Sequence, residues 1–515
     1  MLKHFAGHKR TEAFCLVLTL LLFASITAFS LSFLKHNEPL PTVFAYSNDK
    51  SITLSWEPGS SIQIHVSLSD GNDMLVDQVL SGKDGQWSYT DGCHGMPYWI
   101  RVYPENEPDN VLLDDVRLFL DYDRLPALPL ICVETCSGNE PASTPVTPDV
   151  SLWGASVIDN DYEFCTIQLS GFSSAHGIAD GKIRVRGNTS AIAPKKSFKL
   201  KFDRPVDLLG ISAFASDDWV LIRGNCNLNE YLGRAISSSI GSEWTPQGRF
   251  VNLLLNGDWR GCYFLSECVS MESSHGLVGK NGCIYENDAY WWNENGLYFR
   301  TAHQPAQLGY TLKYPSVSSV ENRCMVSLQT IVETYEEMIF DGNVQYRDYI
   351  DETSFARWIL GQDIMGNGDG GGSNFYYYIF DFNHPEQSNV KMGPLWDFDK
   401  AFFTTDEWSS SSWEICSFFP QLFAQQSFQD NYRALWAEVS PKLYDEVCKS
   451  LEFLNLTSGA ALDESFLLNA RRWGEEYCPL DTQIENALNW YQERIEWMNA
   501  QIFESPDGLL SRAAG

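Results

Sequence analysis

Three aspartates and an asparagine lie close together in the second half of this 515-residue chain. Asp369 precedes Asn374 by five positions in the glycine-rich segment GNGDGGGSN. Asp397 and Asp399 follow in PLWDFDKAFF, among large apolar residues. A carboxylate can orient an attacking hydroxyl group and accept its proton, and carboxylate and amide oxygens are ligands for Mg²⁺. These residue types could therefore position a hydroxyl nucleophile and hold a divalent cation.

A structural alternative exists for each of these segments. GNGDGGGSN is also typical of a turn, because Asp and Asn favour turns for backbone reasons. Asp397 or Asp399 could equally cap a helix. Against this, carboxylates beside Trp396 and Phe398 are costly to bury, and the charge of a bound magnesium ion would offset that cost. For each segment taken alone, the structural alternative is the better-supported interpretation.

The elements that must position these residues follow from hydrophobic periodicity. Residues 352–366 predict a helix ahead of the glycine-rich segment, and NFYYYIF and GPLWDF predict buried strands after it. LLLNGDWRGCYFL predicts a hairpin that turns at Asn256-Gly257. From Phe418 onward, apolar residues at i, i+3 and i+4 spacing predict helices. This mixture predicts an α+β domain over residues 128–505 with a helical C-terminal lobe.

A chain of this length predicts two or three domains. Between about Thr42 and Leu120, short runs such as SITLSWEP and YWIRVYPEN alternate apolar and polar residues between turn signals. This pattern predicts a small Ig-like β-sandwich over residues 38–127. No cluster of reactive side chains marks this segment, so we interpret it as a spacer or as a sugar- or protein-binding module.

The N-terminus predicts a membrane anchor. An uncharged apolar run extends from Ala13 to Leu34, and as a helix it would span roughly 33 Å, enough to cross a bilayer core. Lys3, Lys9 and Arg10 precede it, which predicts a cytoplasmic N-terminal tail. Residues 1–37 are therefore predicted to be a tail and a single transmembrane helix, with the bulk of the chain outside the cytoplasm. A cleaved signal peptide is the alternative.

Net charge limits the classes of partner, and the cysteine content allows two states of the thiols. The chain has 36 basic and 67 acidic residues and a formal net charge of −31. This argues against nucleic acid as a partner, because phosphate backbones are bound by clustered positive surfaces. Of the 13 cysteines, Cys15 lies in the predicted anchor. The others either form disulfides in an exported chain or are buried free thiols.

Five motifs occur in a specific order: IRVRGNTSAIAPKKSFKLKF, LLLNGDWRGCYFLSE, YTLKYP, the segment of Asp369 and Asn374, and PLWDFD. In this order they closely resemble the CotH family, the spore-coat-protein-H-like atypical protein kinases, over about residues 128–500. The resemblance implies a divergent, two-lobed protein-kinase-like fold. It also implies binding of ATP with Mg²⁺ and phosphorylation of Ser or Thr hydroxyl groups on an exported or surface protein.

By this resemblance Asp369 is the catalytic base, since it keeps the D-x-x-x-x-N spacing of kinase catalytic loops with Asn374. Asn374 and Asp397 are then metal ligands, and Asp399 is a further ligand. Two features depart from the usual pattern. No H-R pair precedes Asp369, and glycines fill the spacer; in addition, KAFFTT follows PLWDFD where the family usually has a glycine. A catalytically inactive pseudokinase is therefore an open alternative.

The segment PKKSFKLKF concentrates lysines in an otherwise acidic chain. The resemblance implies that Lys196 or Lys199 contacts the nucleotide phosphates, as the strand lysine of kinases does. Arg186 could clamp the same phosphates in a bidentate way, and Glu267 could orient the lysine or bind metal. The alternatives are an exposed basic edge strand that deters aggregation and a solvated glutamate at a strand end.

Two non-catalytic functions are the rival predictions. A surface protein that uses this fold for adhesion, or for carbohydrate or cell-wall binding, is favoured by export, since ATP is scarce outside cells. A calcium-stabilised carbohydrate-binding protein would use the aspartate-rich loops as calcium sites. A ligand that binds the native state stabilises it, so melting with ATP and magnesium, or with calcium alone, separates these functions.

Overall fold

The computed structural model describes residues 40–47, 51–56, 58, 61–70, 73–91, 97–119, 127–146, 157–172, 177–187, 189–209, 215–224, 226–291, 297–305, 308–315, 322–368, 374–384, 388–402, 404–409 and 418–513. The predicted anchor and Asp369 lie outside these residues. Within the described part of the chain, no helix is both long and apolar enough to cross a membrane.

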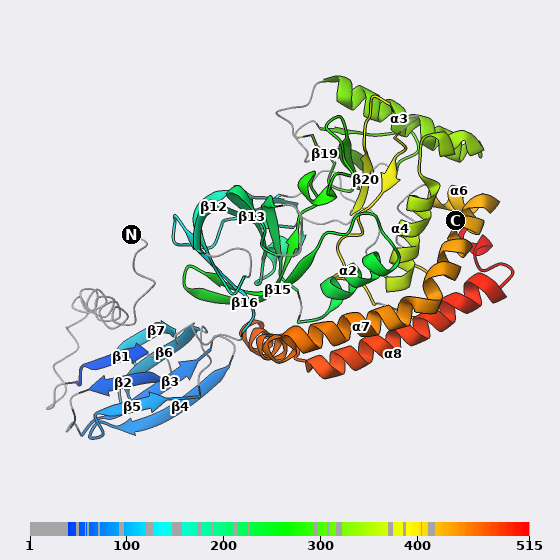
Figure 1. Cartoon of the computed structure of the whole chain (residues 1–515). Coiled ribbons are helices and arrows are strands. Elements are labelled where there is room, and N and C mark those ends of the chain that lie inside the picture. Colours follow the sequence, from blue (N-terminus) through cyan, green and yellow to red (C-terminus); the bar gives the residue numbers. More distant parts are fainter. Residues whose placement is uncertain are drawn as a thin grey trace. The chain divides into compact units, whose positions relative to one another are not determined.

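The chain divides into two compact units, of which the first comprises Met1–Ala127, Gly257–Gly261 and Leu468–Glu476. Its strands are β1 (Val43–Ser47), β2 (Ile52–Trp56), β3 (Gln63–Ser69), β4 (Met74–Ser81), β5 (Gln86–Tyr89), β6 (Pro97–Pro104) and β7 (Leu113–Phe119). They form a three-stranded sheet in the order β1-β2-β5 and a four-stranded sheet in the order β4-β3-β6-β7 (Figure 1). Period-two alternation in β3 buries Ile64, Val66 and Leu68.

The second unit contains a closed barrel in the order β11-β12-β13-β14-β16-β15-β8 (Figure 1). Its strands are β8 (Leu130–Thr135), β11 (Glu163–Ser170), β12 (Gly177–Arg186), β13 (Ser197–Val206), β14 (Ser216–Ile222), β15 (Gly248–Leu255) and β16 (Asp258–Glu267). Fully buried apolar side chains such as Ile183, Leu200 and Leu221 fill it. The sequence pattern predicts strands here but not a closed barrel, because alternation identifies a buried face and not the partner strand.

Strands β15 and β16 form the predicted hairpin. Asn256 and Gly257 at its turn have φ values of 52° and 77°, the left-handed conformation that Asn-Gly turns adopt. The Asn256 carboxamide oxygen accepts a hydrogen bond from the Thr135 amide at 2.8 Å. The turn is thereby fixed to the end of β8.

The second unit also contains a five-stranded sheet in the order β18-β19-β17-β20-β21, whose strands follow those of the barrel in the chain (Figure 1). Its strands are β17 (Cys283–Asp288), β18 (Tyr298–Phe299), β19 (Gly309–Tyr314), β20 (Phe375–Ile379) and β21 (Lys391–Met392). The prediction of a strand over GPLWDF is wrong. After Met392 the chain leaves the ladder, and Asp397 has a φ of 64° that an extended strand cannot contain. The departure places the aspartates in a loop.

The described α-helices are α2 (Asn229–Ser239), α3 (Asn322–Phe340), α4 (Glu352–Met365), α6 (Phe419–Phe423), α7 (Gln426–Trp473) and α8 (Leu480–Asn499). The shorter elements are β9 (Thr144–Val146), β10 (Val157–Asp159), the 3₁₀ turns Thr189–Ile192, Glu272–Ser274, Val344–Asp348 and Leu510–Ala513, and the π turn Ala500–Glu504. The described residues therefore form a mixed helix and sheet structure of the α+β class. Helix α4 begins after Asp351, whose side chain accepts from the Ser354 amide, and ends at left-handed Gly366. This stop lies directly ahead of the segment that contains Asp369.

Candidate functional site

Asn374 and Asp397 are in contact, although strands β20 and β21 lie between them in the chain. The Asn374 Nδ2 atom donates a hydrogen bond to Asp397 Oδ2 at 3.2 Å. Both residues have left-handed backbones, with φ values of 69° and 64°. For residues other than glycine, this conformation costs of order 1–3 kcal/mol, although Asn and Asp tolerate it better than most. Such strain persists only where the surrounding structure enforces it, as at a functional site.

A second asparagine binds the same aspartate from the other side of the glycine-rich segment. Asn367 is fully buried, and its Nδ2 atom donates to the Asp397 carbonyl oxygen at 3.1 Å and to Gln362 Oε1 at 2.9 Å. Asn367 and Asn374 are the described flanks of the segment that carries Asp369. Residues Trp396–Asp399 form the WDFD loop. Because both asparagines bind Asp397, they are fixed at this loop.

A buried acid on the five-stranded sheet holds the Asn374 backbone. Glu286 on β17 is 6% exposed, and its Oε1 atom accepts from the Asn374 amide at 2.9 Å. Lys313 on β19 compensates the carboxylate, with Nζ 3.1 Å from Glu286 Oε2 and 3.5 Å from Asp288 Oδ2. Burial raises the pKa of Glu286 even though the neighbouring lysine opposes the shift. The sheet therefore carries a charged cluster next to the predicted metal ligands.

Helix α2, which lies between barrel strands β14 and β15 in the chain, supports the WDFD loop. Its buried ion pair joins Glu230 and Arg234 at 2.6 Å, and Glu230 Oε1 accepts from the Phe398 amide at 3.4 Å. A Cβ atom at Gly233 would lie 2.3 Å from the Phe398 ring, so glycine is needed for this close approach. Desolvation raises the pKa of Asp399 and the negative charge of Glu230 adds to the shift, while Lys400 and Arg223 oppose it. Carboxylates thus gather at this loop.

Two of the predicted phosphate-binding residues face this loop. Arg186 places its guanidinium carbon 5.8 Å from the centre of the Trp396 ring. Lys199 is opposite Val220 in the ladder between β13 and β14, and Val220 packs in one apolar cluster with Trp396. Lys199 Nζ lies 2.8 Å from Asp218 Oδ2. The edge-strand alternative is wrong, because β13 pairs with β12 on one side and β14 on the other.

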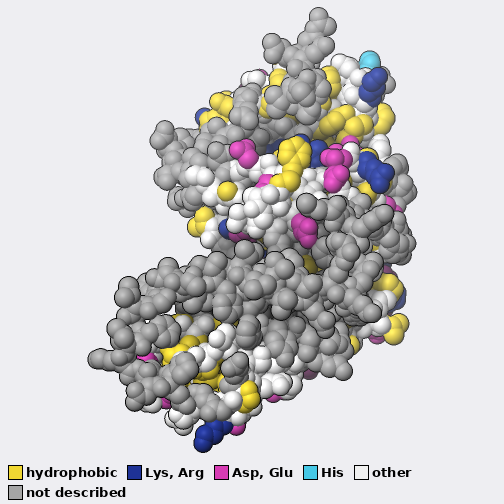
Figure 2. Space-filling view, turned by 90° about the vertical axis from the view of Figure 1, so that its left-hand side faces the viewer, with side chains coloured by type: hydrophobic (Ala, Val, Ile, Leu, Met, Phe, Trp, Pro, Cys, Tyr) yellow, Lys and Arg dark blue, Asp and Glu magenta, His cyan; other side chains and the backbone are white. Residues whose placement is uncertain are grey.

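Two other predicted residues have different contacts. Lys196 Nζ pairs with Glu140 Oε1 at 2.5 Å. Glu267 is 1% exposed, accepts from the Gln247 amide at 2.8 Å and lies 3.6 Å from the His275 ring, so the solvated alternative is also wrong. Neither set of described contacts reaches Asn374 or Asp397. Among the described residues on the face drawn in Figure 2, acidic and basic side chains lie near one another.

The donor set fits a magnesium ion. Among the described residues, no three carboxylate, histidine or cysteine side chains are gathered in a metal-binding group. Mg²⁺ in phosphoryl-transfer sites needs fewer, since one or two carboxylates act together with waters and substrate phosphates. Asp397 supplies a half-buried carboxylate, and because Asn374 donates through its nitrogen, its carboxamide oxygen is the atom suited to a cation. Asp399 supplies a further carboxylate.

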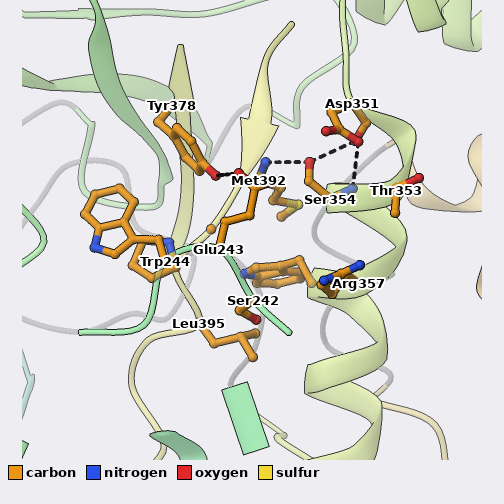
Figure 3. A pocket seen from close by; sticks show the side chains of 13 residues that line it. Ser242, Glu243, Trp244, Asp351, Thr353, Ser354, Arg357, Tyr378, Met392 and Leu395 are labelled. Carbon is orange, nitrogen blue, oxygen red and sulfur yellow. Dashed lines mark hydrogen bonds between the residues drawn. The ribbon is translucent and has the colours of Figure 1, made fainter. Parts of the chain in front are cut away.

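A separate pocket lies beside Tyr378 of β20 (Figure 3). It encloses about 50 Å³, and its lining includes Trp244, Tyr378 and Glu243. The Tyr378 hydroxyl donates to Glu243 at 3.3 Å, and the same carboxylate binds Lys391 at 2.6 Å. The predicted site residues do not line this pocket, so it is distinct from the candidate site.

Reasoning from the sequence missed the polar and charged residues that support the site, namely Glu230, Arg234, Glu286, Lys313 and Asn367. One signal was available, because CIYEND places two acids in an apolar strand, where an acid is costly unless it has a partner. Lys313 lies within YTLKYP, but its partner Glu286 is on a different strand. Spacing alone does not reveal such a pair.

A match to a known protein family covers this region of the chain. The family model described as CotH kinase protein matches residues 183–451, which is more than half of the chain. The matched region includes Arg186, Lys199, Asn374 and Asp397. No curated protein matches the chain.

Proposed function

The chain belongs to the CotH kinase protein family, and on this premise we propose that it is an atypical kinase that transfers the γ-phosphoryl group of ATP to a protein hydroxyl. In this proposal the barrel with α2 corresponds to one kinase lobe. The five-stranded sheet with α3, α4 and the C-terminal helices corresponds to the other. Asn374, Asp397 and Asp399 then belong to the catalytic loop and the metal loop.

The observation that carries the proposal is the double attachment of Asp397. Asn367 binds its carbonyl oxygen and Asn374 binds its carboxylate. The segment between these asparagines contains Asp369, the proposed base. A kinase needs its base segment and its metal aspartate at one place, because catalysis of phosphoryl transfer is almost entirely positioning and charge stabilisation.

Each residue then has a defined task. Asp369 orients the acceptor hydroxyl and takes its proton. Asn374, Asp397 and Asp399 offer oxygen ligands, and Mg²⁺ held there would neutralise charge on the phosphates. Arg186 and Lys199 supply positive charge toward the phosphate oxygens. Lys196 and Glu267 are left out of this proposal, because their described contacts lead to Glu140 and Gln247.

We further propose that the chain is a single-pass membrane protein whose bulk is extracytoplasmic, and that its substrates are Ser or Thr residues of exported or surface proteins. The uncharged run from Ala13 to Leu34 and its basic flank support this proposal. A non-catalytic surface protein is the competing function. The three glycines between Asp369 and Ser373 favour it, because a glycine-rich spacer holds a catalytic loop less firmly.

The test uses the full chain, purified in mild detergent. ATP with magnesium should raise its melting temperature, and labelled phosphate from γ-labelled ATP should appear on the chain or on a Ser/Thr-rich peptide pool. Stabilisation without transfer would identify a pseudokinase. Stabilisation by calcium without nucleotide would instead support the carbohydrate-binding alternative, and no response to nucleotide would contradict kinase function.

A further inference from the structure

The contact between Glu286 and Asn374 joins two elements that are far apart in the chain. Glu286 is buried in β17, and Asn374 directly precedes β20. Their contact runs from the Asn374 amide to Glu286 Oε1 at 2.9 Å, beside the ladder in which Glu286 pairs with Tyr376. An ordinary ladder partner would be a backbone carbonyl. Here a carboxylate takes that place, which gives a charge-assisted hydrogen bond.

This hydrogen bond acts on the backbone of a predicted metal ligand. Asn374 has a φ of 69°, and in this conformation its carboxamide reaches Asp397 Oδ2 at 3.2 Å. Without an acceptor at its amide, the residue would be free to return to an extended backbone and turn its side chain away. Lys313 Nζ, 3.1 Å from the other carboxylate oxygen, compensates the buried charge that makes the hydrogen bond possible.

We propose that Glu286 is a positioning residue of the magnesium site, which holds Asn374 in its left-handed conformation and so directs the Asn374 carboxamide to the metal position. The proposal rests on the proposed kinase function only in its assignment of the metal. Glu286 itself touches neither metal nor substrate in this scheme. Its effect passes through Asn374, as that of an outer-shell partner does at other metal sites.

Asp288 provides a matched control on the same strand. It is 4% exposed, and its carboxylate lies 3.5 Å from the same Lys313 Nζ. Its other described partners are Thr311 and the Tyr290 amide, and none of these contacts includes Asn374. Loss of the Asp288 charge therefore perturbs the same buried cluster without releasing Asn374.

The first measurement is hydrogen exchange of the Asn374 amide in the full chain, without nucleotide. Glu286→Ala should increase its exchange rate about tenfold or more, while Asp288→Asn should leave it within about threefold of the wild type. Glu286→Gln keeps an acceptor oxygen and should retain most of the protection. Unchanged exchange in Glu286→Ala would overturn the proposal, whether or not the chain proves to be a kinase.

The second measurement is the magnesium concentration that gives half of the ATP-induced rise in melting temperature. Glu286→Ala should increase it about 10–100-fold, the effect seen for outer-shell partners, and Asp288→Asn should not. In an Asn374→Ala background, Glu286→Ala should add less than about twofold, because the two residues act in series. Additive effects would assign Glu286 a general structural role. If magnesium and ATP do not change the melting temperature of the wild type, the kinase function is refuted, but the hydrogen-exchange result still stands.

Discussion

Two groups of carboxylates in the second unit show different ways of placing negative charge inside a fold. Asp363 on α4 is fully buried, and Arg512 binds its two oxygens at 2.7 and 3.0 Å. The Tyr432 hydroxyl and the Ser409 amide donate to the same carboxylate at 2.7 and 3.1 Å. Protein donors alone therefore satisfy this charge, and they join α4, α7 and the C-terminal segment.

The group around Asp397 is arranged differently. Asp397 is half-buried, its neighbour Asp399 reaches the surface, and Glu230 adds a third carboxylate nearby. Protein cations already lie in this group, because Arg234 pairs with Glu230 at 2.6 Å and the positive charges of Lys400 and Arg223 oppose the raised pKa of Asp399. The comparison indicates that the Asp363 group stabilises the fold, and we propose that the Asp397 group receives an additional positive ligand.

The largest expected effect is on stability, from Asp363→Ala. This change leaves buried Arg512 without its carboxylate, and breaking a buried ion pair costs about 3–5 kcal/mol. Urea unfolding of the full chain should show a loss of that size. A loss below about 1 kcal/mol would show that the Asp363 group is not a structural centre.

Asp397→Asn should reduce activity and leave stability intact, the reverse of the effect expected for Asp363→Ala. It preserves shape but removes a full negative charge from the metal loop, so phosphoryl transfer should fall by about 100-fold or more. The melting temperature without ligands should stay the same or rise, because carboxylate repulsion decreases. We would measure transfer, magnesium–ATP affinity and apo melting on this variant. Unchanged affinity would mean that Asp397 is not a metal ligand.

A smaller effect should separate the two lysines of the PKKSFKLKF segment. Lys199→Met should weaken ATP binding about tenfold, since one phosphate contact is lost. Lys196→Met is the matched control, because both lysines pair with an acid but only Lys199 lies opposite Val220 of the Trp396 cluster. Lys196→Met should therefore leave ATP affinity unchanged. Calorimetric titration of both variants measures this difference. Equal effects would remove Lys199 from the proposed phosphate site.

The smallest effect is expected at a surface charge group in the first unit. The His65 ring contacts Asp77 at 2.5 Å and Glu105 at 2.7 Å, and the hydrogen bond to Asp77, with that to Glu105, raises the pKa of His65 despite partial burial. The protonated form is thus favoured in the folded state. This stabilisation is complete below the ordinary pKa of about 6.5 and is lost as the pH rises through the raised value.

The expected contribution of His65 is below about 1 kcal/mol, because the group is partly exposed. Melting curves between about pH 5 and pH 9 should show His65→Gln less stable than the wild type at low pH, with the difference closing at high pH. A difference that is independent of pH would mean that packing on Tyr103, on which the ring stacks, matters more than charge.

The sequence by itself determined the local features and named candidate residues for the site. The Asn256-Gly257 turn, helix α4 and strand β20 follow from short-range patterns, which act between neighbours in the chain. The D-x-x-x-x-N spacing and the WDFD segment named Asn374 and Asp397 as candidates, and the order of five motifs identified the family. The membrane anchor and the role of Asp369 stay predictions, because both lie outside the described residues.

Only the tertiary structure decided which charges meet. Lys196 and Lys199 are nearly adjacent in sequence, yet one pairs with Glu140 and the other lies on the barrel face that packs near Trp396. Glu286 reaches Asn374 from a strand 88 residues earlier, through sheet register that no local period encodes. A buried charge is tolerated only where the whole fold brings it a partner, and those partners come from distant segments that spacing cannot identify.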